Sequence, residues 1–349
     1  MAEKKKTKKA KNDDCLTGHC PVPVEPDPNL VKLSEGSGGR DMQVLIDGLR
    51  KKLPHAGSWK NLSDDSATIK LGNEHLVFTT DSYVVTPIFF PGGNIGKLAF
   101  CGTVNDLSVM GATPLGLSLG LVIEEGFPKS ELDQIMKTIG DLSKKTKIPV
   151  VTGDTKVMER GAIDRIVINT SGVGLTKKVL DEKLKVGDKI IVSGGIGEHG
   201  TALLAKRFEL ETDLPTDSKP LHEEMKAILK DVKQARDITR GGLAAVLNEI
   251  ANKNNVRFTI EEERVPMKDE VAALTQILGV EVYNLACEGT FVCFADAKKA
   301  NLAVRQLSKF NKRAAIVGEV QKGSDVIVQT RFGQKMLSMP LGEVVPRIC

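Results

Sequence analysis

Residues 75–85 read HLVFTTDSYVV, an apolar run in which β-branched and aromatic side chains predict a β-strand. Four more runs of this kind lie between about residues 65 and 180, bounded by glycine, aspartate or proline. They are ATIKL (67–71), GLSLGLVIE (116–124), IPVVTGD (148–154) and DRIVINTSGVGL (164–175). Several strands so close together along the chain predict a sheet.

Two helical patterns alternate with these runs. One covers about residues 97–110. In the other, over about 131–147, apolar residues recur at spacings of three and four, so one stripe of the helix should face a sheet: Leu132, Ile135, Met136, Ile139 and Leu142. We therefore expect residues 34–180 to form one domain of mixed helix and strand.

A second domain is predicted for residues 181–330. The segment LKVGDKIIVSGGIGEHG (184–200) starts a new succession of strand, loop and helix. The lysine-rich and then proline-rich residues 1–33 are predicted to form a flexible arm. Residues 331–349, with two prolines and few helix signals, are predicted to be an extended, mobile tail. The fold class expected from this order is α+β with two domains.

Composition and charge narrow the function classes. The chain has 349 residues, 41% of them hydrophobic, which is enough for a sizeable core. No apolar run approaches the roughly 18–20 residues of a membrane span, and no apolar segment follows the first lysines, so we expect a cytoplasmic protein. The net charge of +4 comes from residues 1–11, which contribute +5. Neither a membrane nor a nucleic acid is expected as a partner.

Six cysteines without a signal peptide indicate reduced thiols rather than a disulfide framework. Cys101, Cys287 and Cys293 lie inside apolar patterns and are expected in the core. The motif CLTGHC (15–20) can bind a metal, but no second pair of ligands stands at zinc-finger spacing. The role of this motif stays open.

Five aspartates stand at strand ends or turns, in SDDSA, TTDSYV, NDLSVMGA, TGDTKV and DITRGG. Any one of them alone is ordinary turn or cap chemistry. If the loops converge, their carboxylates form the oxygen-rich site that Mg²⁺ prefers when it also binds nucleotide phosphates. The five are Asp65, Asp81, Asp106, Asp154 and Asp237.

Glycine-rich loops are the second recurring feature: GSGGRD (36–41), PGGNIGK (91–97), SGGIGEHG (193–200) and TRGGL (239–243). Such loops let main-chain N–H groups approach phosphate oxygens, although glycine also makes plain turns. None matches the Walker loop or the dinucleotide-binding pattern of glycines.

Taken in order, DDSA, TTDSYVVTPIFF, NDLSVMGA, TGDT and DITRGG resemble the aminoimidazole ribonucleotide synthetase (PurM-like) superfamily over nearly all of residues 35–330. The resemblance implies a two-domain, ATP-binding α+β subunit that pairs as a homodimer and phosphorylates an oxygen atom. It implies Mg²⁺ bound by the five aspartates above. It also implies that ATP is bound by Gly38, Gly39, Asp41, Asp81, Asn105, Asp106, Thr152, Gly153, Asp154 and Arg240.

Within that superfamily, GSGGRDM near the start and PRIC at residues 346–349 resemble the hydrogenase maturation factor HypE family of carbamoyl dehydratases. The resemblance implies that Cys349 receives a carbamoyl group from the carbamoyltransferase HypF. ATP then drives its dehydration to a thiocyanate, which supplies cyanide to the iron centre of [NiFe]-hydrogenase through a HypC–HypD complex. The implied catalytic residues are Cys349, Glu288 and Lys156.

The chemistry of an S-carbamoyl group agrees with these residue types. Oxide is a very poor leaving group, and phosphorylation of the carbamoyl oxygen converts it to phosphate. Two N–H protons must then leave, so proton acceptors are needed. Glu288 is the stronger candidate for a base, whereas Lys156 needs a lowered pKa to act as one and otherwise provides positive charge to the phosphoryl group.

Two alternatives stay open. One is a small-molecule kinase or synthetase of the same superfamily, such as thiamine-monophosphate kinase, which has no use for a terminal thiol. Selenophosphate synthetase needs a cysteine or selenocysteine beside its glycine-rich loop, and GSGGRD has neither. The other is a non-catalytic metal or sulfur carrier, which leaves the acidic and glycine-rich loops without a role.

Overall fold

The computed structural model describes residues 29–53, 56–342, 345 and 347–349. Nearly all of the predicted arm and the whole CLTGHC motif lie outside the described residues. None of the helices in the described part of the chain has the length and apolar character that a membrane span requires.

Five strands form the first sheet, in the order β1-β2-β7-β5-β6, with only β5 and β6 parallel. Along β2, alternate residues such as Val77, Thr79 and Tyr83 are buried, as expected for a strand with one covered face. The strands agree with the five predicted runs to within a few residues: β1 Ala67–Leu71, β2 Glu74–Tyr83, β5 Thr113–Glu124, β6 Val150–Met158 and β7 Ile166–Thr176.

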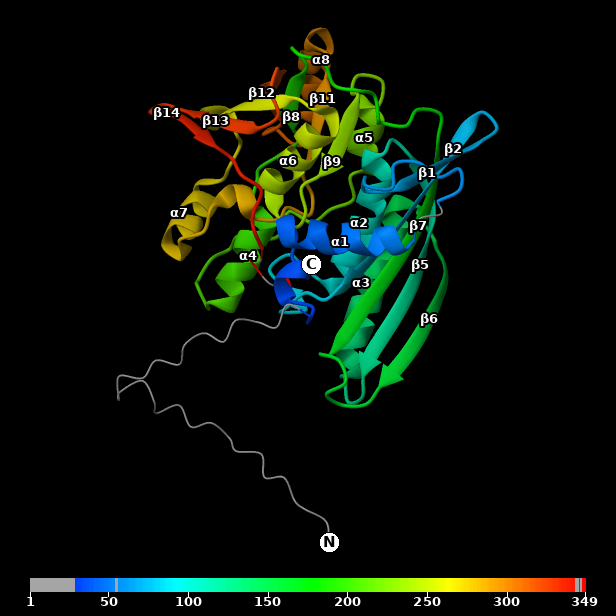
Figure 1. The fold of residues 1–349 in the computed structure, drawn as a ribbon. Helices are drawn as coiled ribbons and strands as arrows, with labels where there is room; N and C mark the ends of the chain where they lie inside the picture. Colours follow the sequence, from blue (N-terminus) through cyan, green and yellow to red (C-terminus); the bar gives the residue numbers. More distant parts are fainter. Residues whose placement is uncertain (1–28, 54–55, 343–344, 346) are drawn as a thin grey trace. The chain divides into compact units, whose positions relative to one another are not determined.

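Helix α2 (Ile95–Val109) packs against β2, β5 and β7 and is buried on nearly all sides (Figure 1). It begins where the Asn94 side chain accepts hydrogen bonds from the main-chain N–H groups of Gly96 (3.0 Å) and Lys97 (3.2 Å). Helix α3 (Lys129–Thr146) packs against α2 with the predicted apolar stripe, which buries Ile135 and Ile139. Both helices therefore lie close to their predicted positions.

A short hairpin, β3 (Phe89–Phe90) and β4 (Gly93–Asn94), precedes α2. Before the first sheet, the 3₁₀ helix η2 (Leu33–Gly36) leads into α1 (Arg40–Lys52). Two further 3₁₀ helices, η3 (Glu262–Arg264) and η4 (Val282–Asn284), belong to the second half of the chain.

Seven strands form the second sheet, in the order β14-β13-β10-β12-β8-β11-β9. Alternate residues of β11 enter two different apolar clusters, Val292 and Phe294 one and Phe291 and Cys293 the other, so both faces of this sheet are covered. The strands are β8 Lys189–Val192, β9 Gln234–Asp237, β10 Arg257–Glu261, β11 Phe291–Ala295, β12 Ala315–Gln321, β13 Val326–Thr330 and β14 Gly333–Met336.

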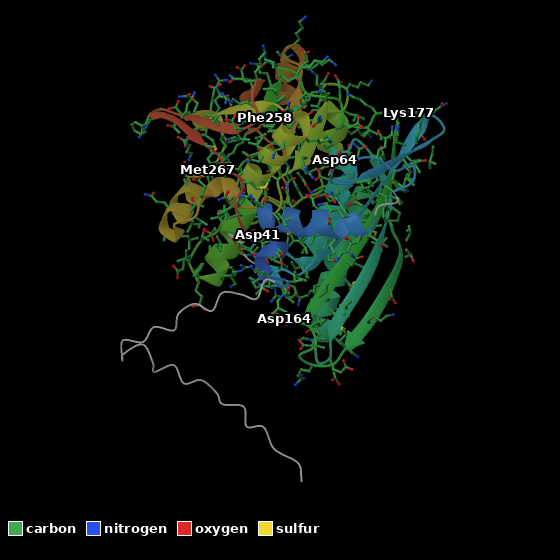
Figure 2. The ribbon with its side chains drawn as sticks, viewed as in Figure 1. Asp41, Asp64, Asp164, Lys177, Phe258 and Met267 are labelled. Atoms are coloured by element: carbon green, nitrogen blue, oxygen red, sulfur yellow. The ribbon has the colours of Figure 1, made fainter. Side chains whose placement is uncertain are left out.

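Helices cover the second sheet on its two faces. Helix α6 contacts β10 and β13, near the buried Phe258 that Figure 2 labels, whereas α8 contacts β8, β11 and β12. Cys101, Cys287 and Cys293 are fully buried, which confirms their predicted place in the core. The helices of this part are α4 Glu198–Arg207, α5 His222–Ile228, α6 Gly242–Asn254, α7 Asp269–Leu278 and α8 Ala297–Leu307.

The end of the chain is packed in this structure. The predicted tail over 331–349 begins with β14, which pairs with β13, and then returns to the first sheet. Val345 and Ile348 are buried in the same apolar cluster as the residues of α2. Burial of these two side chains gives the tail a resting position that its two prolines and polar residues did not predict.

The close approach of α2 to β2 generates the first testable prediction. A Cβ atom added at Gly102 would lie 2.1 Å from the Tyr83 hydroxyl oxygen. Gly102→Ala should therefore displace Tyr83 and lower the free energy of unfolding by about 1–3 kcal/mol. Gly140 in α3 has no atom within 4 Å of an added Cβ. Gly140→Ala should instead raise stability by about 0.5–1 kcal/mol. Urea unfolding of both variants measures the difference, and equal effects would contradict the packing described.

Candidate active site

A cavity of about 210 Å³ lies where the loop before β1, the strand β2, the helix α2 and the end of β9 meet. Acidic side chains dominate its wall, and the terminal cysteine closes part of it. Seven of the predicted site residues line this cavity: Asp65, Asp81, Asp106, Asp237, Arg240, Glu288 and Cys349.

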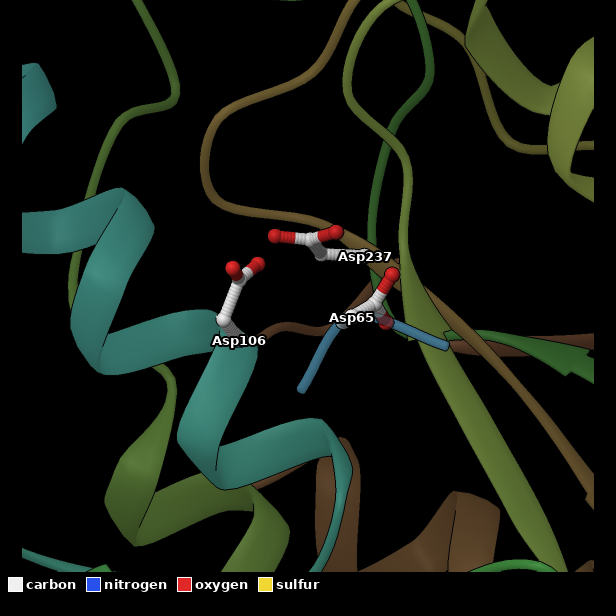
Figure 3. Close-up of side chains that lie close together, drawn as sticks. All are labelled: Asp65, Asp106 and Asp237. Carbon is white, nitrogen blue, oxygen red and sulfur yellow. The ribbon is translucent and has the colours of Figure 1, made fainter. Parts of the chain in front are cut away.

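Three of the carboxylates form a tight cluster (Figure 3). Asp65, Asp106 and Asp237 each offer an oxygen atom, and these atoms lie within 4.8 Å of one another. They come from three different elements: the loop before β1, the helix α2 and the last position of β9. The cluster therefore exists only because the two halves of the chain pack together.

Ion pairs fasten the loop before β1 to the second half of the chain. The Arg236 side chain donates from Nε to Asp65 Oδ1 (2.7 Å) and pairs through Nη1 with Glu249 (3.0 Å). The neighbouring Asp64, labelled in Figure 2, pairs with Lys253 (2.6 Å). These contacts hold Asp65 beside Asp237, because Arg236 and Asp237 are adjacent in β9.

Crowding of negative charge in a buried place perturbs all three carboxyls. Burial, opposed by Arg236, raises the pKa of Asp65 from 3.8 to about 6. Burial and then the neighbouring carboxylates raise the pKa of Asp106 and of Asp237 well above the usual range. Asp65 Oδ2 and Asp237 Oδ2 are buried without a hydrogen-bond partner. A divalent cation with oxygen ligands fits this donor set, since it would satisfy both atoms and relieve the repulsion.

Asp81 lies on the covered face of β2 and accepts a hydrogen bond from the Tyr83 hydroxyl (3.2 Å) at Oδ2. The Thr79 hydroxyl, on the same face of the strand, lies 2.7 Å from Asp106 Oδ2. Alternation along β2 thus places three polar side chains toward α2 and the cavity.

Glu288 stands in the loop between η4 and β11 and is 3% exposed. Its main-chain N–H donates to Asp217 Oδ1 (3.0 Å), and the N–H of Gly289 donates to Asp217 Oδ2 (3.1 Å). The Glu288 Oε1 atom is buried without a partner. Burial, then Asp237 and further acidic neighbours, raise the pKa of the Glu288 carboxyl well above its usual range. A carboxyl of this kind can hold or accept a proton near neutral pH.

Cys349 enters the cavity from the end of the tail and packs against the apolar cluster around α2. Burial raises the pKa of its thiol, and Glu288, Asp81 and Asp237 raise it further, while Arg240 opposes them. The thiol inside the cavity is therefore protonated and a poor nucleophile. The structure brings the sulfur and the predicted base to the same cavity.

Arg240 lines the cavity, and the glycine-rich loop 36–39 packs against it. A Cβ atom on Gly38 would lie 2.8 Å from the Arg240 carbonyl carbon, and one on Gly39 would lie 2.4 Å from the Pro340 oxygen. Asp41, in the first turn of α1, donates its N–H to Leu341 O (3.3 Å) and is not among the cavity residues. These glycines therefore permit close approach to the protein's own main chain, whereas their predicted phosphate contacts stay a prediction.

Asn105 is 1% exposed and connects loops, and its predicted contact with the nucleotide stays a prediction. Its Nδ2 donates to the carbonyls of Lys219 (3.2 Å) and Glu288 (3.3 Å), and its Oδ1 accepts from the Leu221 N–H (2.8 Å). The side chain thus fixes the loop that carries Glu288, and it is not among the cavity residues.

One predicted group is not brought to the cavity. Thr152, Gly153, Asp154 and Lys156 lie on β6, the edge strand of the first sheet, where all four are exposed. Lys156 pairs there with Asp154 (2.9 Å). The expectation that all five aspartates converge is therefore wrong within a single chain: four line the cavity, and Asp154 does not because β7 and β5 stand between β6 and β2.

Sequence reasoning missed Tyr83 and Arg236, which line the cavity. Tyr83 stands two residues after Asp81, so the alternation of a strand was the available signal. Arg236 directly precedes Asp237, but nothing in the sequence pairs it with Asp65, which lies 171 residues earlier.

Two family models match the chain and cover most of it. The AIR synthase related protein N-terminal domain matches residues 63–176, and the corresponding C-terminal domain matches residues 185–331. The fold and the site thus define the class as the two-domain AIR synthase related proteins, which confirms the predicted α+β fold and the superfamily resemblance.

More specific relatives share almost the full length. The carbamoyl dehydratase HypE of Rhizobium leguminosarum bv. viciae is 41% identical over 333 residues, which cover 91% of this chain and 95% of the relative. A crystal structure of a HypE–HypF complex matches with a TM-score of 0.79 and 36% identity, covering 85% of this chain and 99% of that chain. A crystal structure of the hydrogenase maturation protein HypE in complex with ATP matches with a TM-score of 0.76 and 35% identity, over 92% and 100%. The chain belongs to the carbamoyl dehydratase HypE family.

The crowded carboxylates predict how Mg²⁺ should affect stability. Because the pKa of Asp65 is higher in the folded chain than in the unfolded chain, ionisation destabilises the fold as pH rises from about 4 through about 6. Mg²⁺ binds the ionised carboxylates, so its stabilising effect should grow over the same window. Saturating Mg²⁺ should raise the melting temperature by about 2–4 °C at pH 7.5 and by much less at pH 5.

Two variants test whether the Mg²⁺ effect arises at the acidic cluster or at the edge strand β6. Asp237→Asn removes one of the repelling carboxylates, so it should raise the melting temperature without Mg²⁺ and abolish the shift with Mg²⁺. Asp154→Asn on β6 should leave the Mg²⁺ shift of the isolated chain unchanged. Melting curves that show the opposite ranking would place the cation elsewhere.

Proposed function

We propose that this chain uses ATP and Mg²⁺ to dehydrate a carbamoyl group, carried on the sulfur of its own Cys349, to a thiocyanate. The observation that carries the proposal is the position of Cys349 in the same cavity as Glu288 and the acidic cluster. We infer that the thiocyanate supplies cyanide for the iron centre of [NiFe]-hydrogenase. The relatives, carbamoyl dehydratases and a HypE bound to ATP, support this proposal.

The proposed reaction has two steps. In the first, the carbamoyl oxygen attacks the γ-phosphorus of ATP, the bond to ADP breaks, and one N–H proton leaves to give an S-linked imino-phosphate. In the second, the remaining N–H proton leaves, the carbon–oxygen bond breaks, and phosphate departs as S–C≡N forms. The products are the thiocyanate, ADP and phosphate, and of the two protons one stays on phosphate and one is released.

Glu288 is the proposed acceptor of an N–H proton. Its carboxyl is buried and lines the cavity beside Cys349, and Oε1 has no hydrogen-bond partner. Arg240, which opposes the raised pKa of both Glu288 and Cys349, is placed to stabilise negative charge that develops during phosphoryl transfer. A divalent cation bound by Asp65, Asp106 and Asp237 would bind phosphate oxygens and lower the pKa of nearby carboxyls.

We infer that two copies of the chain pair through the edge of the first sheet at β6. The outer edge of β6 has no neighbouring strand in the described part of the chain, and Val151 (65% exposed) and Val157 (68%) lie open on it. In such a homodimer, Lys156 of each copy serves the cavity of the other. This arrangement reconciles the predicted role of Lys156 with its distance from the cavity of its own chain.

Partners and location follow from the same proposal. The HypE–HypF complex supports a carbamoyltransferase HypF as the source of the carbamoyl group. A HypC–HypD complex is the proposed acceptor of the cyanide, and we place the reaction in the cytoplasm. A kinase of the same superfamily, the alternative function, would leave the cavity position of Cys349 without a purpose.

Intact-mass spectrometry tests the reaction directly. After Cys349 is loaded with a carbamoyl group, addition of ATP and Mg²⁺ should remove the mass of one water from the adduct. The loss should require both ATP and Mg²⁺, and Cys349→Ala should carry no convertible adduct. A fully loaded protein whose mass does not change with ATP and Mg²⁺ would refute the proposed function.

Substitution of the proposed base should slow the conversion without preventing ATP binding. Glu288→Gln keeps the shape of the side chain but cannot accept a proton, so the rate should fall by about 10²–10⁴-fold. Glu281 is exposed and lies seven residues earlier in the chain, so Glu281→Gln serves as the control and should leave the rate unchanged. Single-turnover mass spectrometry measures both rates, and a Glu288→Gln rate near that of the parent protein would exclude Glu288 as the base.

A further inference from the structure

The last three residues, of which Cys349 lines the cavity, are held through their main chain. The Arg347 carbonyl accepts a hydrogen bond from the N–H of Thr86 (3.1 Å), and the Cys349 carbonyl accepts one from the N–H of Val84 (3.4 Å). The Arg347 Nε atom donates in return to the Val84 carbonyl (3.0 Å). The tail thus lies along residues 84–86, directly after β2, much as an added strand would.

Two side chains of α4 complete this set of contacts. Arg207 Nη2 donates to the Arg347 carbonyl (2.6 Å), and its Nε donates to the Thr86 carbonyl (2.6 Å), so one guanidinium joins the tail to the segment after β2. His199 Nε2 lies 2.9 Å from the Ile348 carbonyl oxygen. With these contacts, the main-chain oxygens of all three terminal residues have donors.

We propose that His199 and Arg207 are positioning residues of the dehydration, which hold the tail by its carbonyls so that the Cys349 sulfur stays in the cavity. The proposal rests on the function proposed above. Neither side chain lines the cavity. Both therefore act on the sulfur through the main chain of the tail.

The geometry fixes the tautomer of His199. A carbonyl oxygen only accepts, so Nε2 must carry the hydrogen that bonds to Ile348. His199 is fully buried, and burial lowers its pKa from 6.5 to about 4, so the ring is neutral and Nδ1 is an acceptor. The Thr216 hydroxyl, 2.7 Å away, must then donate to Nδ1. This chain of donors orients the imidazole toward the tail without any charge.

The segment of residues 216–218, which contains Thr216, also positions the proposed base. Thr216, which orients His199, directly precedes Asp217, whose carboxylate accepts the main-chain N–H groups of Glu288 and Gly289. The Thr216 hydroxyl additionally accepts the Ser218 N–H (3.0 Å). Residues 216–218 therefore connect His199, which holds the tail, to the loop that carries Glu288. One segment thus positions both the Cys349 sulfur and the Glu288 carboxyl.

Contacts of this kind suit a tail that must also leave. They bind main-chain atoms and make no bond to the sulfur, so they do not depend on what the sulfur carries. Each hydrogen bond contributes modestly, and Ile348 packs against Gly200, where an added Cβ would lie 3.3 Å from Ile348 Cδ1. The resting position is thus favoured but reversible.

Paired variants test the two side chains separately. His199→Asn retains a polar group near Thr216 but is too short to reach the tail, whereas His199→Gln extends an amide donor toward Nε2's position. Arg207→Met removes both donated hydrogen bonds and keeps the apolar stem. Lys206→Met removes a charge from the preceding, exposed position of α4 and serves as the matched control.

The first measurement is the rate at which iodoacetamide alkylates Cys349, followed on the C-terminal peptide released by cleavage after glutamate. Release from the cavity exposes the thiol and returns its pKa toward the ordinary value, so alkylation should be about tenfold faster in Arg207→Met and His199→Asn. His199→Gln should lie near the parent protein, and Lys206→Met should not differ from it. Thermal melting checks that each variant is folded at the assay temperature.

The second measurement is the single-turnover dehydration rate at saturating ATP of protein loaded by cyanate. Arg207→Met and His199→Asn should lose about tenfold in this rate while their affinity for ATP is unchanged, a split that general destabilisation does not produce. Equal alkylation rates in the parent, Arg207→Met and His199→Asn would overturn the proposal. If alkylation follows the expected order but the loaded parent protein does not lose water, His199 and Arg207 still hold the tail in the cavity, whereas the proposed function fails.

Discussion

Repulsion among three buried carboxylates is the constraint on which this structure depends. Asp65, Asp106 and Asp237 come from different elements, and their ionised carboxylates would have a lower free energy if they were separated and hydrated. Arg236 offsets part of the cost by pairing with Asp65 and Glu249, and in doing so it ties the loop before β1 to β9. The negative charge that remains uncompensated fits a divalent cation, which would in turn bind the phosphate oxygens of a nucleotide.

The position of the terminal thiol follows from the same packing. The tail can reach the cavity only because α4 and the segment after β2 lie together and present donors to its carbonyls. Asp217 then holds the main chain of Glu288, which lines the same cavity. The sulfur and the proposed base are thus positioned through residues 216–218, and the acidic cluster through the ion pairs of Arg236.

Much of the fold could be predicted from sequence, because strands and helices follow local periodicity. The runs at 67–71 and 164–175 became β1 and β7, and the apolar stripe at 131–147 became α3. What local patterns do not contain is the order of strands in a sheet. Asp154 follows an apolar run and Asp237 does not, yet β9 ends at the cavity, whereas β7 and β5 stand between β6 and β2.

In the site too, some residues could be predicted from motifs, whereas others are brought into place only by packing. Cys349 and Glu288 could be named because their motifs resemble those of a family. His199 and Arg207 could not, since a side chain that holds a main-chain carbonyl requires no motif in its partner. Gly38 and Gly39 were assigned to phosphate binding, although in this structure they allow close approach to Arg240 and Pro340.

The acid-lined cavity affects the two steps of the proposed cycle, loading of Cys349 and dehydration of the carbamoyl group, in different ways. Loading of Cys349 requires a thiolate, and the carboxyls around the sulfur together with burial raise the pKa of the thiol. Dehydration has no such requirement, because an S-carbamoyl group has no S–H proton to lose. The surroundings that make Cys349 a poor nucleophile are therefore harmless to the loaded sulfur, and they favour proton acceptance by Glu288. Loading outside the cavity and dehydration inside it is the order that these electrostatics favour, and reversible main-chain contacts of the tail make that order possible.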